Sequence, residues 1–242
     1  MQLQLSTWQD VEQYLQRSQR ILIPIGSTEQ HGPTGLLGTD AICPELIGHR
    51  FGEKHNLMVA PTLGIGMAQH HMAFAGTISL RPSTLIAVIE DVVSSLVRHG
   101  FRELLFLNGH GGNINTIRTA FAEVLAKSHA LPAQQPPQLN LHNWYLGKAV
   151  RTLAHSLYGD AEGAHATPTE LSLSWVAYPE QSRHQEMTPK IAPKGHSNLD
   201  AASFRRQFPD GRMASDPNLA SVDHGNRILA AALEDLENIW PN

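Results

Sequence analysis

Two stretches of the sequence place carboxylates and a histidine where they could bind a metal ion. Glu29 and His31 lie two positions apart in the glycine-flanked stretch 26–32, so in an extended segment both side chains leave the same face. Asp40 follows at the expected start of a helix. Its carboxylate could bind the same metal ion, or it could serve only as a helix N-cap. Carboxylate and imidazole ligands without thiolates suit Zn²⁺, Mn²⁺ or Fe²⁺ and are typical of a catalytic metal site.

His110 strengthens this interpretation. It lies in the turn NGHGGN (108–113), directly after an apolar run, and this turn is too rich in glycine to need a bulky side chain for packing. The histidine could be a ligand, a general base or a chance loop residue. We interpret it as a ligand, because the cluster at 29–40 lies at an equivalent strand end. A carboxylate that bridges two ions roughly 3.5–4 Å apart creates a pair able to generate hydroxide at neutral pH.

A third stretch, EGAHATPTE (162–170), offers His165 for acid–base chemistry. Glu170 has a structural alternative, because Thr167 three positions before it completes the pattern of a helix capping box. Two histidines are adjacent at 70–71. Neighbouring side chains cannot both face one point in regular structure, so we expect one of these two histidines near the site.

The elements that must position these residues alternate along the chain. Strands alternating with helices predict an α/β fold, a mostly parallel sheet layered between helices, in which ligands bind at the carboxyl ends of the strands. The stretch 131–138 is expected to be a surface connection, and 179–217 to be loops at a candidate subunit contact. The expected strands are 21–25, 57–60, 103–107 and 139–142, and the expected helices are 6–17, 40–54, 85–99 capped by Ser83, 114–127, 167–176 and 219–239.

Composition excludes several classes of protein. The chain has 242 residues, 41% of them hydrophobic, and a net charge of -4 without a basic stripe, so no nucleic-acid binding is expected. Cys43 is the only cysteine, which excludes a disulfide framework and a multi-thiolate metal site, and we interpret it as a small buried residue. No signal peptide and no apolar run of about 18 residues is present, so we expect a cytoplasmic protein without a membrane span.

Several motifs resemble those of the creatininase (creatinine amidohydrolase) family. They are GSTEQHGP…GTD (26–40), NGHGGN (108–113) and HAxxxE (165–170), together with the turn FAGTISL (74–80) and the late stretch 216–225. They occur in order from residue 21 to about 235. The resemblance implies one creatininase-like domain over 1–242, a three-layer α/β/α sandwich, a homo-oligomer (a hexamer) and a two-metal site that hydrolyses an amide bond.

The family pattern also implies individual roles. Glu29 and His31 correspond to ligands of separate metal ions, Asp40 to the bridging carboxylate, and His110 to a further ligand of the ion that Glu29 binds. His165 corresponds to the residue that transfers protons. We therefore expect catalytic roles for His165 and for Glu170, the acidic residue five positions later. We expect two divalent ions, zinc in the first place and manganese or iron as alternatives.

The chain departs from the pattern of true creatininases. These carry a Tyr-Glu pair directly after the strand-end histidine, and this Glu completes the second metal site, whereas the present chain has Gly111 and Gly112. Glu170 and Glu162 are the candidates to replace it; without such a replacement the second ion would bind weakly. Further departures are the stretch AQHH (68–71) in place of Ser-x-Glu-His, TGL (34–36) in place of His-Leu-Pro, and DAEG (160–163), which lacks the aromatic lid.

These departures make creatinine an unexpected substrate. Relatives with a similar Gly-Gly turn include formylamidopyrimidine deformylases and peptidases that trim a cofactor precursor. The expected function is hydrolysis of a carbon–nitrogen bond in a small cyclic or linear amide: a metal-bound hydroxide attacks the carbonyl, and His165 protonates the departing nitrogen. One alternative is a deformylase or peptidase of the same family that acts on a linear amide. An alternative of another class is a catalytically silent metal-binding subunit or sensor.

Overall fold

Four short strands form one parallel sheet at the centre of the molecule. In the computed structural model, which describes residues 1–129, 135–196 and 199–241, the strands pair in the order β2 (Met58–Val59), β1 (Arg20–Ile25), β3 (Glu103–Asn108) and β4 (Gln138–Asn143). All three neighbouring pairs are parallel. The predicted strands are therefore confirmed, and each strand end lies within one residue of its expected position.

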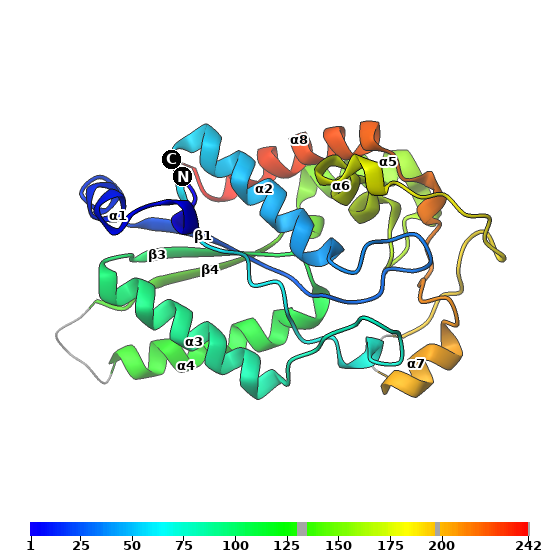
Figure 1. Ribbon diagram of the computed structural model, residues 1–242, viewed down its shortest axis with the longest axis horizontal. Coiled ribbons are helices and arrows are strands. Elements are labelled where there is room, and N and C mark those ends of the chain that lie inside the picture. Colours follow the sequence, from blue (N-terminus) through cyan, green and yellow to red (C-terminus); the bar gives the residue numbers. More distant parts are fainter. Residues whose placement is uncertain (130–134, 197–198, 242) are drawn as a thin grey trace.

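Helices cover both faces of the sheet (Figure 1). Helices α3 (Pro82–His99) and α4 (Ile114–His129) lie on one face, and α2 (Thr39–His55), α6 (Pro168–Ala177) and α8 (Val222–Ile239) lie on the other. Successive side chains of β1 point to opposite faces of the sheet. Ile21, Ile23 and Ile25 pack toward α3 and α4, whereas Leu22 packs toward α2. The three-layer α/β/α sandwich is thus confirmed.

Most helices begin near their expected capping residues. Helix α1 (Trp8–Leu15) is capped by Thr7, which forms a capping box with Asp10, so the helix is two residues shorter at each end than the expected 6–17. The capping box predicted for α6 is present between Thr167 and Glu170. The expectation that Ser83 caps the long third helix was wrong, because Pro82 fits the first helical position and Arg81 is the N-cap.

Two helices were not predicted. Helix α5 (Lys148–Tyr158) buries one apolar face, and its first backbone N–H groups, those of Ala149 and Val150, donate to the carboxylate of Asp235. A cap supplied from the distant helix α8 leaves no local sequence signal.

The second is α7 (Ala201–Gln207), which interrupts the stretch that was expected to be only loops. Its Phe204 is fully buried. Much of 179–217 otherwise lacks regular structure, as expected. The predicted surface connection at 131–138 lies in part outside the described residues, and Gln138 already belongs to β4.

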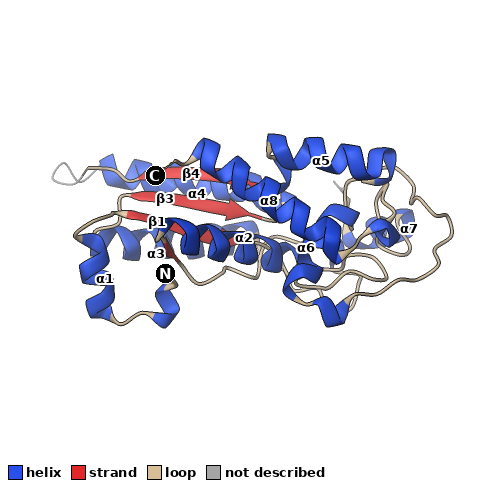
Figure 2. Ribbon diagram, turned by 90° about the horizontal axis from the view of Figure 1, so that it is seen from above, coloured by secondary structure: helices blue, strands red, loops and turns tan. Residues whose placement is uncertain are grey.

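The carboxyl ends of the strands point toward the part of the molecule that holds the unusual residues. In Figure 2 the arrow of β3 points toward the end where α6, α7 and several long loops gather. Parallel strands bring the residues that follow β1 and β3 to the same edge of the sheet. Among the described residues, no helix combines the length and apolarity needed to cross a membrane.

Candidate metal centre

The structure brings the four residues predicted as metal ligands together at this edge. Glu29 and His31 lie in the loop after β1, and His110 follows β3; Glu29 and His31 are 0% exposed and His110 is 5% exposed. Asp40 lies in the first turn of α2, where Gly38 and not Asp40 occupies the N-cap position. The capping alternative for Asp40 is therefore removed, and its buried carboxylate is free to face the other three side chains.

Two glycines let α2 approach the sheet this closely. A Cβ atom at Gly26, after β1, or at Gly109, after β3, would overlap the backbone carbonyl of Asp40. Each strand is therefore followed by a residue without a side chain exactly where the first turn of the helix crosses it. This close approach fixes Asp40 between the two strand ends.

The carboxylate of Asp40 belongs to two groups of potential ligands. One oxygen, Oδ2, lies 3.0 Å from Nδ1 of His110, whose Nε2 lies 3.2 Å from Glu29 Oε2. The other, Oδ1, lies 3.1 Å from Nε2 of His31, which is 3.9 Å from Glu170 Oε1. Within each group, Glu29–Asp40–His110 and His31–Asp40–Glu170, one atom per residue lies within 4.8 Å of the others. Asp40 is thus shared by both groups, with one carboxylate oxygen toward each.

The unsatisfied oxygens of this cluster fit a cation. Both oxygens of Glu29 and Oδ2 of Asp40 are buried and accept no hydrogen bond of suitable geometry. A buried carboxylate oxygen without a partner is costly, and a metal ion would supply the missing partner. The nitrogen and oxygen donors match Zn²⁺ and Mn²⁺, so the residues present fit the divalent ions that the sequence predicted.

The electrostatics agree with this fit. Burial alone would lower the pKa of His31, but the carboxylates of Asp40, Glu170 and Glu29 outweigh it and raise the pKa to about 10. The pKa of His110 is likewise raised to about 9, against the effect of burial, by Glu29 and Asp40. The carboxylates therefore favour positive charge at the positions of these two rings, which is the charge that a bound divalent ion would supply.

His31 is oriented for binding by its second nitrogen. Its Nδ1 lies 3.0 Å from the backbone carbonyl of Glu29, to which it donates, so Nε2 is left free to face Asp40. Metal-binding histidines are usually fixed in this way through the nitrogen that does not contact the ion.

Of the two carboxylates that the sequence offered for the second metal position, Glu170 is the one that lies beside His31 and Asp40. Its carboxylate accepts from the N–H of Thr167 at 2.6 Å and closes the capping box, yet it also faces His31. Glu162 instead accepts from the hydroxyl of Thr169 and belongs to none of the ligand groups. Gly112, where creatininases carry the second carboxylate, has no room for a side chain, since a Cβ would overlap His110 Nε2 and lie 2.6 Å from the carbonyl of Met67.

His165 faces the cluster from the opposite side of the loop that carries Gln30. The side-chain amide of Gln30 has two hydrogens, which reach the carbonyl of Gly211 and Nδ1 of His71. Nε2 of His165 lies 2.9 Å from the same amide nitrogen and 2.8 Å from the backbone carbonyl of Gln30; with both amide hydrogens assigned elsewhere, Nε2 carries the hydrogen and donates it to that carbonyl. The unprotonated Nδ1 consequently faces Glu29, 3.9 Å from Oε1. Burial and the neighbouring His71 and His31 hold the pKa of His165 well below its usual range, so its ring is neutral.

One of the two adjacent histidines contacts the cluster. Nε2 of His71 lies 3.1 Å from Oε1 of Glu29, whereas His70 stacks on His71 and is only half-buried. Phe204 of the unpredicted helix α7 packs edge-on against both rings. Helix α7 therefore supports this side of the site.

A cavity of about 1160 Å³ leads to the centre and is lined by Asp40, His110, His165 and Glu170 among others. Tyr145, which follows β4, also lines it; its hydroxyl is buried and has no hydrogen-bond partner. Burial and the carboxylates of the centre raise the pKa of Tyr145 well above its usual range, so the hydroxyl keeps its proton and can donate it.

Sequence reasoning missed both Gln30 and Tyr145. Gln30 stands between two candidate ligands and shows no pattern of its own, because its partners come from distant loops. Tyr145 carried a usable signal, since it follows the carboxyl end of a predicted strand, as Glu29 and His110 do.

Comparison with known proteins identifies similar sequences over nearly the whole chain. The creatininase family, described as creatinine amidohydrolase, matches residues 4–239. A mycofactocin precursor peptide peptidase of Mycobacterium ulcerans is 29% identical over 228 residues, 89% of this chain and 82% of that protein. A 3-dehydro-scyllo-inosose hydrolase of Thermotoga maritima is 30% identical over 195 residues; these cover 79% of this chain but only 60% of the longer relative.

Solved structures show the same fold. A mutant creatininase described as the Zn-Zn type superposes with a TM-score of 0.83 at 23% identity and covers 100% of this chain and 98% of its own. A creatininase described with Mn gives a TM-score of 0.82 at 24% identity, with coverage of 100% and 99%. At this level of identity the likeness concerns the fold alone.

Proposed function

The chain belongs to the creatininase family, and we propose that it is a hydrolase that cleaves a carbon–nitrogen bond of an amide with two divalent metal ions. The observation that carries the proposal is the position of Asp40, whose two carboxylate oxygens face two separate groups of ligands. In this proposal Glu29, Asp40 and His110 hold one ion, and His31, Asp40 and Glu170 hold the other. Bound there, the ions would polarise the amide carbonyl and lower the pKa of water.

His165 is proposed to carry the proton transfer. Its Nδ1 faces the centre without a proton, and its neutral ring can accept one and deliver it to the departing nitrogen. The hydrogen bond from Nε2 to the Gln30 carbonyl fixes the ring in the orientation that this role requires. The carboxylate of Glu170 is proposed to act as a ligand, which gives a more specific role to the residue that sequence analysis placed in catalysis.

A linear amide is the favoured form of the substrate. The cavity of about 1160 Å³ exceeds what a small cyclic amide would fill, since pockets for drug-sized ligands span roughly 300–1,000 Å³. A relative that this chain matches over 89% of its length is named a precursor peptide peptidase. Both points support a deformylase or peptidase activity, the form of amide hydrolysis that acts on a linear substrate.

The proposal includes further expectations from the sequence. We propose zinc as the metal, with manganese or iron able to replace it, because the donors are imidazole nitrogens and carboxylate oxygens. One domain over residues 1–242, assembly as a homo-oligomer and a cytoplasmic location complete the proposal. Elemental analysis of the purified protein tests the identity of the metal, and light scattering tests the oligomeric state.

A substrate screen tests the proposed activity. Zinc- or manganese-loaded protein would be incubated with cyclic ureides, formamides and short peptides, and the released amine would be measured. We expect turnover of a linear amide and about two metal equivalents per chain. Asp40→Ala should lose both, because it removes the bridge, whereas Glu53→Ala, on the exposed face of the same helix, should keep both. Normal hydrolysis by Asp40→Ala would refute the two-ion scheme, and two bound ions without turnover would favour the silent metal-binding alternative.

A further inference from the structure

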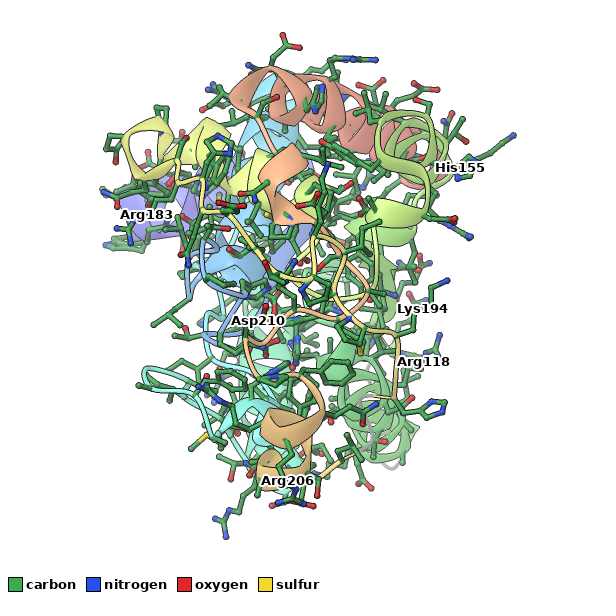
Figure 3. The ribbon with its side chains drawn as sticks, turned by 90° about the vertical axis from the view of Figure 1, so that its right-hand side faces the viewer. Arg118, His155, Arg183, Lys194, Arg206 and Asp210 are labelled. Atoms are coloured by element: carbon green, nitrogen blue, oxygen red, sulfur yellow. The ribbon has the colours of Figure 1, made fainter. Side chains whose placement is uncertain are left out.

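Helix α5 presents a row of basic residues to the cavity that holds the candidate metal centre. Lys148, Arg151 and His155 occupy positions i, i+3 and i+7 of this helix, so they lie along one face, and all three line the cavity. Lys194, from the loop before α7, lines it as well. Figure 3 shows His155 and Lys194 along the same side of the molecule.

These basic residues have no ion-pair partner among the described residues, although Lys148 also borders a second pocket that contains Glu234 and Asp235. Helix α5 contains no acidic residue, and Lys148, Arg151 and Lys194 form no ion pair with any described carboxylate. Exposed lysines elsewhere do find partners, as Lys127 does with Glu90. Like charges one helical turn apart repel each other, so this row is unfavourable until an anion reaches it.

The acidic groups of the cavity balance this charge only in part. Asp160 and Glu162 line the same cavity, but burial raises the pKa of Glu162 to about 7, so this carboxyl is charged only in part at neutral pH. The three carboxylates of the centre are outweighed once two divalent ions bind to them. The mouth and the floor of the cavity would then both attract negative charge.

We propose that the substrate is an amide that also carries an anionic group, a carboxylate or a phosphate, which Lys148, Arg151 and Lys194 bind at the mouth of the cavity. This inference rests on the proposed hydrolytic function, because it places the amide at the metal centre. A guanidinium group such as that of Arg151 binds carboxylate and phosphate oxygens through two parallel hydrogen bonds. The volume of the cavity leaves room for both ends of such a molecule.

Calorimetric titration of the zinc-loaded full chain tests the proposal through binding rather than turnover. Each of two pairs of formamides compares an anionic molecule with a neutral one: N-formylglycine with the nearly isosteric N-formylglycinamide, and N-formyl-O-phosphoethanolamine with N-formylethanolamine. We expect the wild type to bind at least one anionic member about tenfold more tightly than its neutral partner. The pair with the larger ratio identifies carboxylate or phosphate as the preferred group.

Variants separate the basic row from the metal ions, which can also bind anions. In the double variant Lys148→Ala/Arg151→Ala, the ratio of the affinity for the anionic member to that for its neutral partner should fall about fivefold or more. In Lys148→Glu/Arg151→Glu this preference for the anion should disappear. The control Arg183→Ala/Arg206→Ala removes the same charge from residues that do not line the cavity, and Figure 3 shows both away from His155. It should keep the wild-type preference. All variants should melt at or above the wild-type temperature, since the exchanged side chains are exposed.

Two outcomes would overturn the proposal. The first is a wild type that binds charged and neutral members equally, and the second is a preference that persists in Lys148→Ala/Arg151→Ala, which would assign the anion to the metal centre. Failure of the proposed function looks different. In that case the anionic preference would follow the basic row as expected, but neither these formamides nor the amides of the wider screen would be hydrolysed.

Discussion

Nε2 of His31 lies 3.9 Å from Oε1 of Glu170, although the two residues follow different elements in opposite halves of the chain. The same oxygen of Glu170 accepts the N–H of Thr167 and begins helix α6. One carboxylate therefore serves both a helix end and the candidate second metal position. The two roles make different demands, since the cap needs an acceptor oxygen and the metal needs a charge.

The variant Glu170→Gln separates these two roles. Glutamine keeps an oxygen for the N–H of Thr167 but loses the charge, so we expect the metal content to fall by about one equivalent while the melting temperature stays near that of the wild type. Thr167→Ala should do the reverse, with full metal content and a loss of about 1 kcal/mol from the weakened cap. Elemental analysis and denaturant unfolding measure both quantities. Full metal content in Glu170→Gln would restrict Glu170 to capping.

Gly112 should not tolerate even a methyl group. In Gly112→Ala the new Cβ would overlap Nε2 of His110 and press on the carbonyl of Met67 at 2.6 Å. We expect weaker metal binding and a stability loss of about 1–3 kcal/mol, as for other overpacked sites. Gly111→Ala is the matched control, because its Cβ would meet only the hydroxyl of Tyr145, at an ordinary 3.6 Å. Equal metal affinity in the two variants would contradict this account of the turn.

Tyr145→Phe should reduce turnover without reducing stability. The hydroxyl is buried in the cavity wall and has no partner, so its removal breaks no hydrogen bond within the protein. We expect the unfolding free energy to stay within about 0.5 kcal/mol of the wild type and kcat to fall about a hundredfold, the low end of what a lost hydrogen-bond donor to the reacting amide costs. Tyr158→Phe provides the contrast: its hydroxyl contacts Ser172 and His224, so stability should fall while kcat is kept. Unchanged kcat in Tyr145→Phe would exclude a role for this hydroxyl in catalysis.

Glu162 should make the protein less stable as the pH rises. Burial raises its pKa to about 7 in the folded chain from 4.5, so the folded state holds this proton more tightly than the unfolded state. Its contribution is fully present below pH 4.5 and is lost between about pH 4.5 and 7. Glu162→Gln should remove this loss and be more stable at pH 8 by up to about 3 kcal/mol, since one pKa unit corresponds to about 1.4 kcal/mol. Urea unfolding at several pH values measures the difference, and parallel pH profiles of variant and wild type would disprove the assignment.

The sequence predicted the parts of the structure that depend on neighbouring residues. The apolar runs around Ile21 and Leu105 predicted buried parallel strands, and glycine-rich turns directly after them located Glu29 and His110 at strand ends. These features follow from periodicity and turn chemistry, which act over a few positions. The capping box at Thr167 is local for the same reason, and it was predicted in full.

What could not be predicted depends on distant partners. Helix α5 is capped by Asp235 from another helix, and Gln30 acquires its role from Gly211 and His71, which lie far from it in the chain. The choice of Glu170 over Glu162 likewise required the packing of α6 against α2. Spacing along the chain carries no information on such contacts, because each is created only when separate elements come together.

The close contact of Gly26 and Gly109 with the backbone of Asp40 has a consequence for how this chain can evolve. Neither glycine offers a functional group, yet a methyl group at either position would push the carboxylate of Asp40 away from its partners. Natural selection on catalysis would therefore constrain these two positions as tightly as the ligands themselves. A homologue that changed one of them would need to move the start of α2 as well, so such changes should arise together or not at all.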